Sequence, residues 1–165
     1  LEISVEREQT LTSLGLDTIT FLISTNPGQG LKPLQDVASG GELSRIMLAM
    51  KSVLAEQDEI PTLIFDEIDT GIGGEIAVSV GNHIKKLALQ RQIFCITHLA
   101  SIAVYADNQI KIEKSVSGGV TASNVHVVVG EERVQEIARM LSGDSSSSES
   151  MEHARTMLNK FGGGL

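Results

Sequence analysis

Three short stretches of the sequence combine residue types that bind phosphate or move protons. The first is SGGE at residues 39–42, where two glycines follow a serine. The second is the acidic pair Asp66 and Glu67, which follows the apolar run TLIF, and the third is His98, which follows the apolar run QIFCIT. A bare helix start, carboxylates and an imidazole are groups that can hold a phosphate, bind Mg²⁺ and activate water.

Residues 39–42, called the cradle below, stand at the start of a predicted helix. Apolar residues then recur every three or four positions, which predicts a core-facing stripe. Ser39 and Glu42 have the spacing of a capping box, so they could serve only to begin the helix. Gly40 and Gly41 each cost about 1 kcal/mol of helix propensity, but they leave the N-terminal N–H groups and the helix dipole open to an anion. We therefore expect both a cap and a phosphate site. The stripe comprises Leu43, Ile46, Met47, Met50 and Leu54.

The run TLIF after Pro61 predicts a buried strand with Asp66 and Glu67 at its carboxyl end. Two carboxylates at a buried strand end are costly unless they serve a ligand. In open α/β sheets ligands bind beyond the carboxyl ends of the strands, so Asp66 is predicted to support Mg²⁺ and Glu67 to orient or deprotonate water. The alternative is a solvated loop or the cap of the next helix. That helix is predicted from Glu75 to about Gln90, with Ile76, Val80, Ile84 and Leu87 on its apolar face.

His98 is predicted to lie at the same edge of the sheet as the two carboxylates. The run QIFCIT indicates a second strand, and a strand, a helix and a parallel strand form a right-handed βαβ unit. A histidine at a strand end is often only a capped or core residue. Its placement beside Asp66 and Glu67 nevertheless makes contact with a γ-phosphate a reasonable expectation.

The composition predicts one compact soluble domain, because 165 residues with 41% hydrophobic residues can bury a core. The formal net charge of −8 argues against a main nucleic-acid surface on this segment, which would need clustered Lys and Arg. The single cysteine, Cys95, lies in an apolar run and is predicted to be a buried, reduced thiol. With no apolar stretch of bilayer length and no leader, we expect a cytoplasmic location and no membrane partner.

The segments on either side of these motifs are predicted to be structural and to contribute no catalytic or binding residues. The runs LEISVE and TITFLIST alternate as antiparallel strands and end at the turn NPGQG, and the chain is expected to begin inside a fold. QIKIEK and VTASNVHVVV predict a hairpin around SGG, followed by two helices joined by the linker DSSSSES, with a frayed GGGL end. The inward residues of these helices are predicted to be Val134, Ile137, Leu141, Met151, Ala154, Leu158 and Phe161.

The stretches ASGGELSR, TLIFDEIDTGIGG and CITHLA, in that order, resemble the signature motif, the Walker B motif with its D-loop, and the switch histidine of an ABC-type ATPase head. SGGE together with DEIDTGIGG is most similar to the RecN family, bacterial SMC-like ATPases of DNA double-strand-break repair. The resemblance extends from TNPGQ to the C-terminal helices. In that family a head has two lobes separated in sequence by a long coiled coil, and this chain resembles the C-terminal lobe.

The resemblance implies an α/β, P-loop NTPase-like fold: a mainly parallel sheet flanked by helices, with a small antiparallel layer and without the P-loop lobe. It also implies ATP and Mg²⁺ as cofactors. Asp66 would support the metal, Glu67 would be the catalytic base and His98 would read the γ-phosphate. The cradle would contact ATP held by a second head. The residues implied for nucleotide binding are Ser39, Gly40, Gly41, Glu42 and, in the D-loop, Asp69, Thr70 and Gly71.

The sequence departs from the ABC pattern in several places. Ala38 and Glu42 stand where transporters usually have leucine and glutamine, which favours a repair protein over a transporter, and Gly73 stands where many D-loops have aspartate. No Gly-x-x-x-x-Gly-Lys-Ser/Thr occurs, and GQGLKP does not replace it because Pro33 stands in place of the hydroxyl residue. The Q-loop glutamine is expected in the other lobe. The cradle is thus predicted to serve a nucleotide that another head brings.

We expect the whole chain, 1–165, to be one lobe, with strands and loop at 1–36, the motif-bearing core at 37–107, and the hairpin and last helices at 108–165. The implied partners are the N-terminal P-loop lobe, a second head in an ATP-dependent dimer, and DNA through the complete protein in the bacterial cytoplasm or nucleoid. Two alternatives stay open: the head of another SMC-like or ABC ATPase, and an interaction module that works without ATP. A heptad region upstream would favour the SMC-like assignment.

Overall fold

The protein is described by a computed structural model that covers residues 1–24, 28, 30–36, 39–55, 59–117, 120–143 and 147–162. Several sequence interpretations lie wholly or partly outside these residues. They are the turn at 25–30, the comparison made at Ala38, the SGG of the hairpin, the linker at 144–150 and the end of the chain after Gly162.

An antiparallel sheet forms the N-terminal part of the chain. Strand β1 (Glu2–Thr12) pairs with β2 (Gly15–Ile23), and β2 pairs with the short β3 (Lys32–Pro33), which leads into the 3-10 helix η1 (Leu34–Asp36). Ile3 lies opposite Phe21 and Val5 opposite Ile19, so these apolar side chains share one face of the sheet. The predicted antiparallel pairing of the first two alternating runs is confirmed.

The middle part is a βαβ unit with a long helix beside it. Helix α1 (Gly40–Val53) precedes β4 (Thr62–Phe65), α2 (Gly74–Leu87), β5 (Gln92–Cys95) and the short α3 (Ala100–Ala103). Strands β4 and β5 are parallel, with Leu63 opposite Ile93. Helix α2 packs on them in a core that also takes in α1 and α3. This core comprises Leu48, Phe65, Ile68, Ala77, Val80, Ile84, Leu87 and Ile102. The predicted βαβ unit is therefore present.

The expected α/β class is found, but the expected mainly parallel sheet is not what the described residues form. Only β4 and β5 pair in parallel, whereas the β1–β2–β3 sheet and the hairpin of β6 (Gln109–Ser117) and β7 (Val120–Val128) are antiparallel. A parallel sheet normally has both faces covered. Here one face is open, since the paired residues Ile64 and Phe94 are 69% and 44% exposed.

The predicted core-facing stripe of α1 is wrong for three of its five residues. Leu43, Met47 and Leu54 are exposed, while the buried residues of α1 are Gly41 and Leu48. The helix packs on α2 through Leu48. Among the described residues, no helix or strand covers the exposed side chains of Leu43, Met47 and Leu54. In α2, Ala77 is buried and Ile76 is exposed, and the helix ends at Leu87 rather than near Gln90.

Two helices form the C-terminal part. Helix α4 (Gly130–Ser142) packs against α5 (Ser148–Phe161) and against α3 in a second core. Within it, Val134, Ile137, Ala154 and Leu158 are buried, and Leu141, Met151 and Phe161 are partly buried against it, as the sequence predicted. Gly81 of α2 permits the close approach of Tyr105, because an added Cβ would overlap the tyrosine ring.

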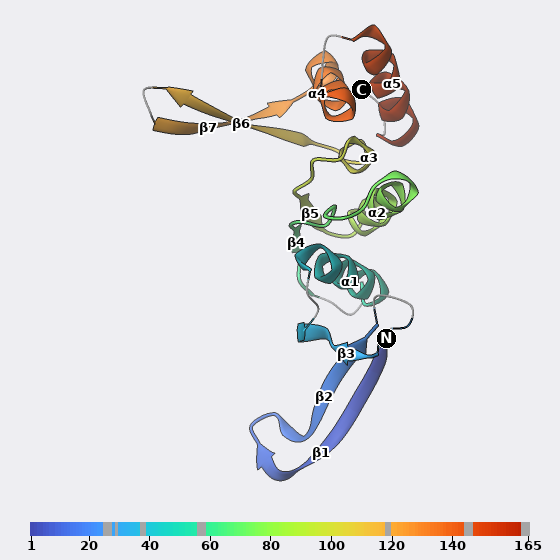
Figure 1. Cartoon of the computed structure of the whole chain (residues 1–165), viewed down its shortest axis with the longest axis vertical. Coiled ribbons are helices and arrows are strands. Elements are labelled where there is room, and N and C mark those ends of the chain that lie inside the picture. The colour runs from blue at the N-terminus through green and yellow to red at the C-terminus, as the bar shows by residue number, and fades with distance from the viewer. Residues whose placement is uncertain are drawn as a thin grey trace.

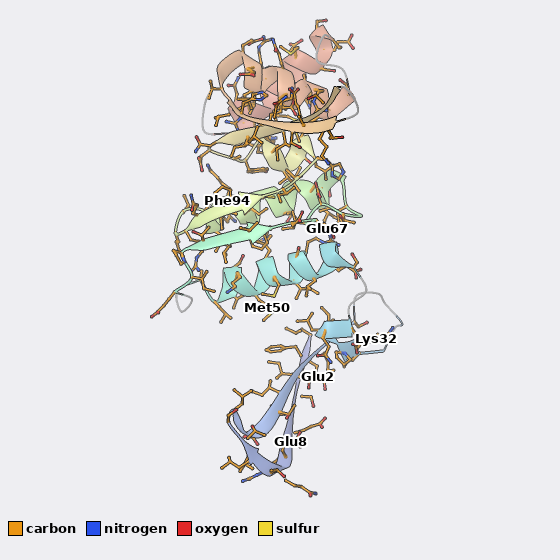
Figure 2. All side chains as sticks on the ribbon, turned by 90° about the vertical axis from the view of Figure 1, so that its left-hand side faces the viewer. Glu2, Glu8, Lys32, Met50, Glu67 and Phe94 are labelled. Carbon is orange, nitrogen blue, oxygen red and sulfur yellow. The ribbon has the colours of Figure 1, made fainter. Side chains whose placement is uncertain are left out.

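The elements follow one another along the long axis of the molecule, as Figure 1 shows: the β1–β2 hairpin at one end, the βαβ unit in the middle, and α4 and α5 at the other end. The β6–β7 hairpin extends to the side. In Figure 2 no described helix lies in front of β4 and β5, so their open face is turned to the viewer together with Phe94. No helix of the described residues is long and apolar enough to cross a membrane. The division at residues 36 and 107 stays a prediction.

Candidate functional site

The polar residues predicted at the strand ends meet at one edge of the β4–β5 pair. Asp66 and Glu67 directly follow β4, and His98 follows β5 after two residues. The imidazole Nδ1 of His98 lies 3.0 Å from Oδ2 of Asp69, so the two strand ends are neighbours. Helix α1 begins at the same edge, and Figure 2 shows Glu67 beside that end of the helix. The arrangement follows from parallel pairing, which brings the carboxyl ends of both strands to one side.

The cradle begins with a genuine helix cap. Ser39 has extended backbone angles, and its side chain accepts a hydrogen bond from the Glu42 N–H at 3.3 Å. Of the two bonds of a capping box, this is the one the structure shows. The prediction that Ser39 caps the helix is confirmed, while a phosphate contact of Ser39 or Glu42 stays a prediction.

Both glycines of the cradle lie against the loop after β4. A Cβ at Gly41 would lie 2.8 Å from the Glu67 carbonyl oxygen, 2.9 Å from Thr70 Cβ and 3.0 Å from Arg45 Nη1. A Cβ at Gly40 would overlap Oε2 of Glu67. The sequence suggests one reason for the glycines, an open helix end, and the structure adds a second at Gly41: helix and loop could not approach this closely with a side chain there.

Two residues at the end of the ASGGELSR stretch, to which the sequence analysis assigned no role, hold α1 to this loop. Ser44 Oγ donates to the Asp66 carbonyl oxygen at 2.6 Å, and Arg45 Nη1 donates to the carbonyl oxygens of Ile68 at 3.0 Å and Thr70 at 2.9 Å. Because the acceptors are backbone atoms, no residue type or spacing in the sequence marks them. Helix α1 and the loop of residues 66–70, called the β4 loop below, therefore form one unit.

Glu67 has a rare backbone conformation. Its φ is +56°, and it is the residue other than glycine with positive φ in the described chain. Such a conformation costs about 1–3 kcal/mol and persists only where the surroundings impose it. Here Thr70 N donates to the Glu67 carbonyl at 3.0 Å, and Glu67 N donates to Asp66 Oδ1 at 2.8 Å. The backbone bend turns the Glu67 side chain toward Gly40 and not along the strand.

The side chains of Asp66 and Glu67 are exposed, which corrects the expectation that they are costly at a buried strand end. The strand before them ends in the buried Phe65, but the carboxylates themselves project into solvent. Because neither carboxylate is buried, a desolvation cost cannot be used to argue that they must bind a ligand. Their case as functional residues rests on position, at the edge where the cradle and His98 also lie.

Asp69 is buried, with 4% of its surface exposed, and connects the β4 loop to the loop after β5. Its Oδ2 accepts hydrogen bonds from Thr97 Oγ1 at 2.6 Å and from His98 N at 2.8 Å. Burial raises the pKa of Asp69, but the Thr97 and His98 bonds and the nearby imidazole outweigh it, so the pKa lies below its ordinary value. Asp69 was predicted as a nucleotide contact of the D-loop, whereas its carboxylate faces inward. Thr97 was not predicted at all.

Thr70 and Gly71, the other predicted D-loop residues, are exposed after Asp69. Gly71 has φ +74°, and an added Cβ there would meet no atom within 4 Å. Their predicted role across a dimer is untested and stays a prediction.

The residues present suit a metal ion that is coordinated partly by the protein and partly by a bound nucleotide and water. Among the described residues no group of three or more His, Cys, Asp or Glu could enclose an ion. Mg²⁺ is commonly held by one or two carboxylates, with water and substrate phosphates as the remaining ligands. An exposed Asp66 whose Oδ1 is oriented by the Glu67 N–H fits that mode and does not fit a self-contained site.

Cys95, the last residue of β5, is a free thiol and only partly buried. Burial, and to a smaller extent the charge of Asp69, raises the pKa of Cys95 to about 12. A thiol with so high a pKa is a poor nucleophile near neutral pH. The prediction of a buried thiol holds only in part, and its reduced state stays a prediction.

Comparison with known proteins shows close sequence relatives. No protein-family model matches the chain. Over 144 residues, 87% of the chain, it is 54% identical to the DNA repair protein RecN of Treponema pallidum and 49% identical to that of Deinococcus radiodurans. Over 150 residues it is 43% identical to RecN of Bacillus subtilis. The matched segments are 25%, 25% and 26% of these relatives, so the chain spans about a quarter of their length.

Two solved structures are more distantly similar. One comes from work on ATP-driven dimerization and DNA-stimulated activation of SMC ATPases; it has a TM-score of 0.47 and 24% identity and covers 73% of this chain and 80% of that one. The other is an SMC head bound to the C-winged helix domain of ScpA, with a TM-score of 0.44 and 24% identity, covering 70% of this chain and 34% of that one. The family follows from the sequence identities alone.

The chain that carries this helix start, acidic strand end and His98 is 43–54% identical to RecN proteins over most of its length. The chain belongs to the RecN family of DNA repair proteins.

Proposed function

We propose that this chain is the C-terminal lobe of an ATP-binding and ATP-hydrolysing head that acts in DNA double-strand-break repair and recombination. The observation that supports this most directly is the meeting of the cradle, the Asp66–Glu67 pair and His98 at one sheet edge. The DNA repair role comes from the RecN relatives. Cleavage of ATP is the reaction for which a phosphate cradle, a metal-binding carboxylate and a base are jointly suited.

Each residue has a distinct role in this proposal. Glu67 accepts a proton from the attacking water, Asp66 holds Mg²⁺ and His98 contacts the γ-phosphate. When bound, Mg²⁺ would neutralise developing charge on the β- and γ-phosphate oxygens. The ATP of the second head is contacted by Ser39, Gly40, Gly41 and Glu42. The two heads are connected by Asp69, Thr70 and Gly71, of which Asp69 acts through the loop that it holds.

The position of Glu67 sets a condition on this mechanism. Its Oε2 lies where a Cβ of Gly40 would be, at the start of α1, which is the place proposed for a phosphate of the second head. Two anions do not share one helix end, because they repel each other. The carboxylate must therefore leave the cradle as the phosphate arrives, which an exposed side chain can do by rotation about its χ angles.

The open apolar surface supports the presence of a second lobe. Ile64, Phe94 and Ile96 are exposed on one face of β4 and β5, and Leu43 and Met47 beside them line a groove of about 250 Å³. The β6–β7 hairpin presents a further exposed stripe of Ile110, Ile112, Val125 and Val127. Apolar surface of this extent usually marks an interface. We propose that the N-terminal P-loop lobe covers it and supplies the phosphate-binding lysine and hydroxyl.

DNA is proposed to bind through the complete protein, since the net charge of this segment is −8. A cytoplasmic location is part of the same proposal.

The test is to join this chain to its N-terminal P-loop lobe and measure ATP hydrolysis with and without double-stranded DNA. The proposal expects Mg²⁺-dependent hydrolysis that neither lobe shows alone. Hydrolysis stimulated by a lipid bilayer or a transport substrate, but not by DNA, would favour another ABC system. Stable docking of the two lobes without any ATP binding would favour an interaction module instead.

A further inference from the structure

We propose that Asp69 is a positioning residue for His98: it holds the imidazole ring through Nδ1 and presents Nε2 at the open edge of the site. The identity of the phosphate that Nε2 meets rests on the proposed function. The pairing of Asp69 with His98 can be tested without it.

One oxygen of Asp69 organises the loop after β5. Its Oδ2 accepts from Thr97 Oγ1 at 2.6 Å and from His98 N at 2.8 Å, and it lies 3.0 Å from His98 Nδ1. Thr97 Oγ1 in turn accepts from Leu99 N at 3.0 Å. The carboxylate thus holds the backbone of His98 by a hydrogen bond and lies within ion-pair distance of its ring.

The ring has one fixed nitrogen and one open nitrogen. A lone pair on Nδ1 would face the ionised carboxylate at 3.0 Å and be repelled by it, so we infer that Nδ1 carries the proton in this contact. In the neutral ring Nε2 then holds a lone pair, because the partner of one nitrogen determines the state of the other. The His98 side chain is 76% exposed whereas Asp69 is buried, so the ring points from a buried anchor into open solvent.

This pairing determines the form in which His98 meets a phosphate. A phosphate oxygen of ATP accepts hydrogen bonds, so contact through Nε2 needs a proton on Nε2 as well. With the Nδ1 proton already facing Asp69, the ring in that contact is an imidazolium. The buried carboxylate is its counter-ion, in the way that a buried aspartate stabilises the imidazolium of a hydrolase triad. Asp69 therefore acts through His98 and does not touch the nucleotide.

His126 provides a contrast within the same chain. It is held through the other nitrogen, with Nε2 3.3 Å from Glu132 Oε1. If carboxylate contacts decide the tautomer, His98 and His126 should carry their protons on different nitrogens when both rings are neutral.

The first experiment is a long-range ¹H–¹⁵N correlation spectrum of the 165-residue chain, recorded about two pH units above the ordinary histidine pKa. The signal of His98 is assigned by its loss in His98→Gln. We expect a proton on Nδ1 of His98 and on Nε2 of His126. A His98 ring protonated on Nε2 in the unmodified chain would overturn the proposal.

Two substitutions separate the ring contact from the support of the loop. Asp69→Ala should abolish the Nδ1 preference of His98. Thr97→Val removes a hydrogen bond to the same oxygen but none to the ring, so it should leave the Nδ1 preference in place. Equal loss of the preference in both variants would mean that loop order alone, and not the Asp69 contact, sets the tautomer.

The second experiment measures ATP hydrolysis by the complete two-lobed protein carrying Asp69→Asn, which keeps an acceptor oxygen and removes the charge. We expect kcat to fall about 10-fold or more, because the imidazolium of His98 loses its ionised partner, with a much smaller change in KM. In a His98→Ala background the same substitution should have little further effect. An equal loss of kcat in both backgrounds would overturn the proposal. Absence of hydrolysis in the unmodified two-lobed protein would contradict the proposed function, and the spectrum would still decide the Asp69–His98 pairing.

Discussion

Neighbouring residues at the end of β4 have different contacts. Asp66 is oriented by the Glu67 N–H on one carboxylate oxygen, which suits a metal ligand that must keep a fixed direction. Glu67 has a positive φ, and its carboxylate lies over Gly40, from which it has to move before it can act. The structure thus supports separate roles for two residues that the sequence shows only as an acidic pair.

Substitution of each carboxylate in the two-lobed protein should give different kinetics. Glu67→Gln keeps the shape but removes the base, so hydrolysis should fall roughly 10²–10⁴-fold while ATP binding persists. Asp66→Ala should weaken Mg²⁺-dependent ATP binding as well as turnover. ATPase rates and equilibrium binding of a fluorescent ATP analogue distinguish the two cases. Equal loss of binding in both variants would contradict the separate roles.

Cys95 should react slowly with alkylating reagents. With a pKa of about 12, its thiolate fraction at pH 8 is about 1000-fold below that of an ordinary cysteine, and alkylation follows the thiolate. The measurement is the rate of iodoacetamide labelling by mass spectrometry, with the urea-unfolded chain as the control. Labelling of the folded chain at the rate of the unfolded one would show that burial does not protect this thiol.

At the scale of elements, α1 and the β4 loop behave as one unit. Ser44 and Arg45 donate from the helix to three carbonyl oxygens of the loop, and Gly41 lets the two backbones approach. Any ligand that moves the start of α1 must therefore also move residues 66–70. This contact connects the cradle to the proposed catalytic carboxylates within one lobe.

The two cradle glycines should respond differently to alanine. At Gly41 the new Cβ meets backbone and Thr70, so Gly41→Ala should destabilise the chain by about 1–3 kcal/mol despite its better helix propensity. At Gly40 the new Cβ meets only the end of the flexible Glu67 side chain, so Gly40→Ala should leave the free energy of unfolding near that of the unmodified chain. Urea unfolding of both variants checks this. A larger loss of stability at Gly40 than at Gly41 would mean that the helix and the loop do not pack in this way.

Some of these elements could be predicted from the sequence and others could not. Ser39 as cap, the βαβ unit and the shared edge of Asp66 and His98 follow from local periodicity and from the geometry of parallel strands. The exposure of Leu43 and Met47 could not be predicted, because an apolar stripe looks the same whether its own chain or another covers it. Ser44 and Arg45 were missed since their acceptors are backbone carbonyls. The inward turn of Asp69 depends on Thr97, which is close in space only after folding.

At the scale of the whole molecule, the protein has two apolar surfaces that its described residues leave uncovered. The apolar faces of the β4–β5 pair and of the β6–β7 hairpin are exposed, and no Gly-x-x-x-x-Gly-Lys-Ser/Thr sequence occurs in the chain. The chain also spans only about a quarter of its relatives. These facts agree with a lobe whose site is completed by the rest of the head and by a second head.

By itself the chain should not bind ATP at micromolar concentration. The cradle offers a helix end and one serine hydroxyl, without the backbone nest and lysine that hold the β- and γ-phosphates. Isothermal titration of the 165-residue chain with Mg²⁺-ATP should give no heat of binding in that range. A micromolar dissociation constant would show a nucleotide site within the chain itself.

The central claim, that the cradle of one head serves the nucleotide of another, is tested most directly by mixing two inactive variants of the complete protein. Ser39→Arg blocks the cradle and Glu67→Gln removes the base, so each variant alone should hydrolyse ATP poorly. In a mixed dimer, the head with Ser39→Arg keeps its own Glu67 and meets an intact cradle on its partner, so one of the two sites is complete. A 1:1 mixture of freely exchanging two-fold dimers should therefore recover about a quarter of the unmodified rate. Recovery near that value is the predicted result. A mixture no more active than its components would contradict the claim.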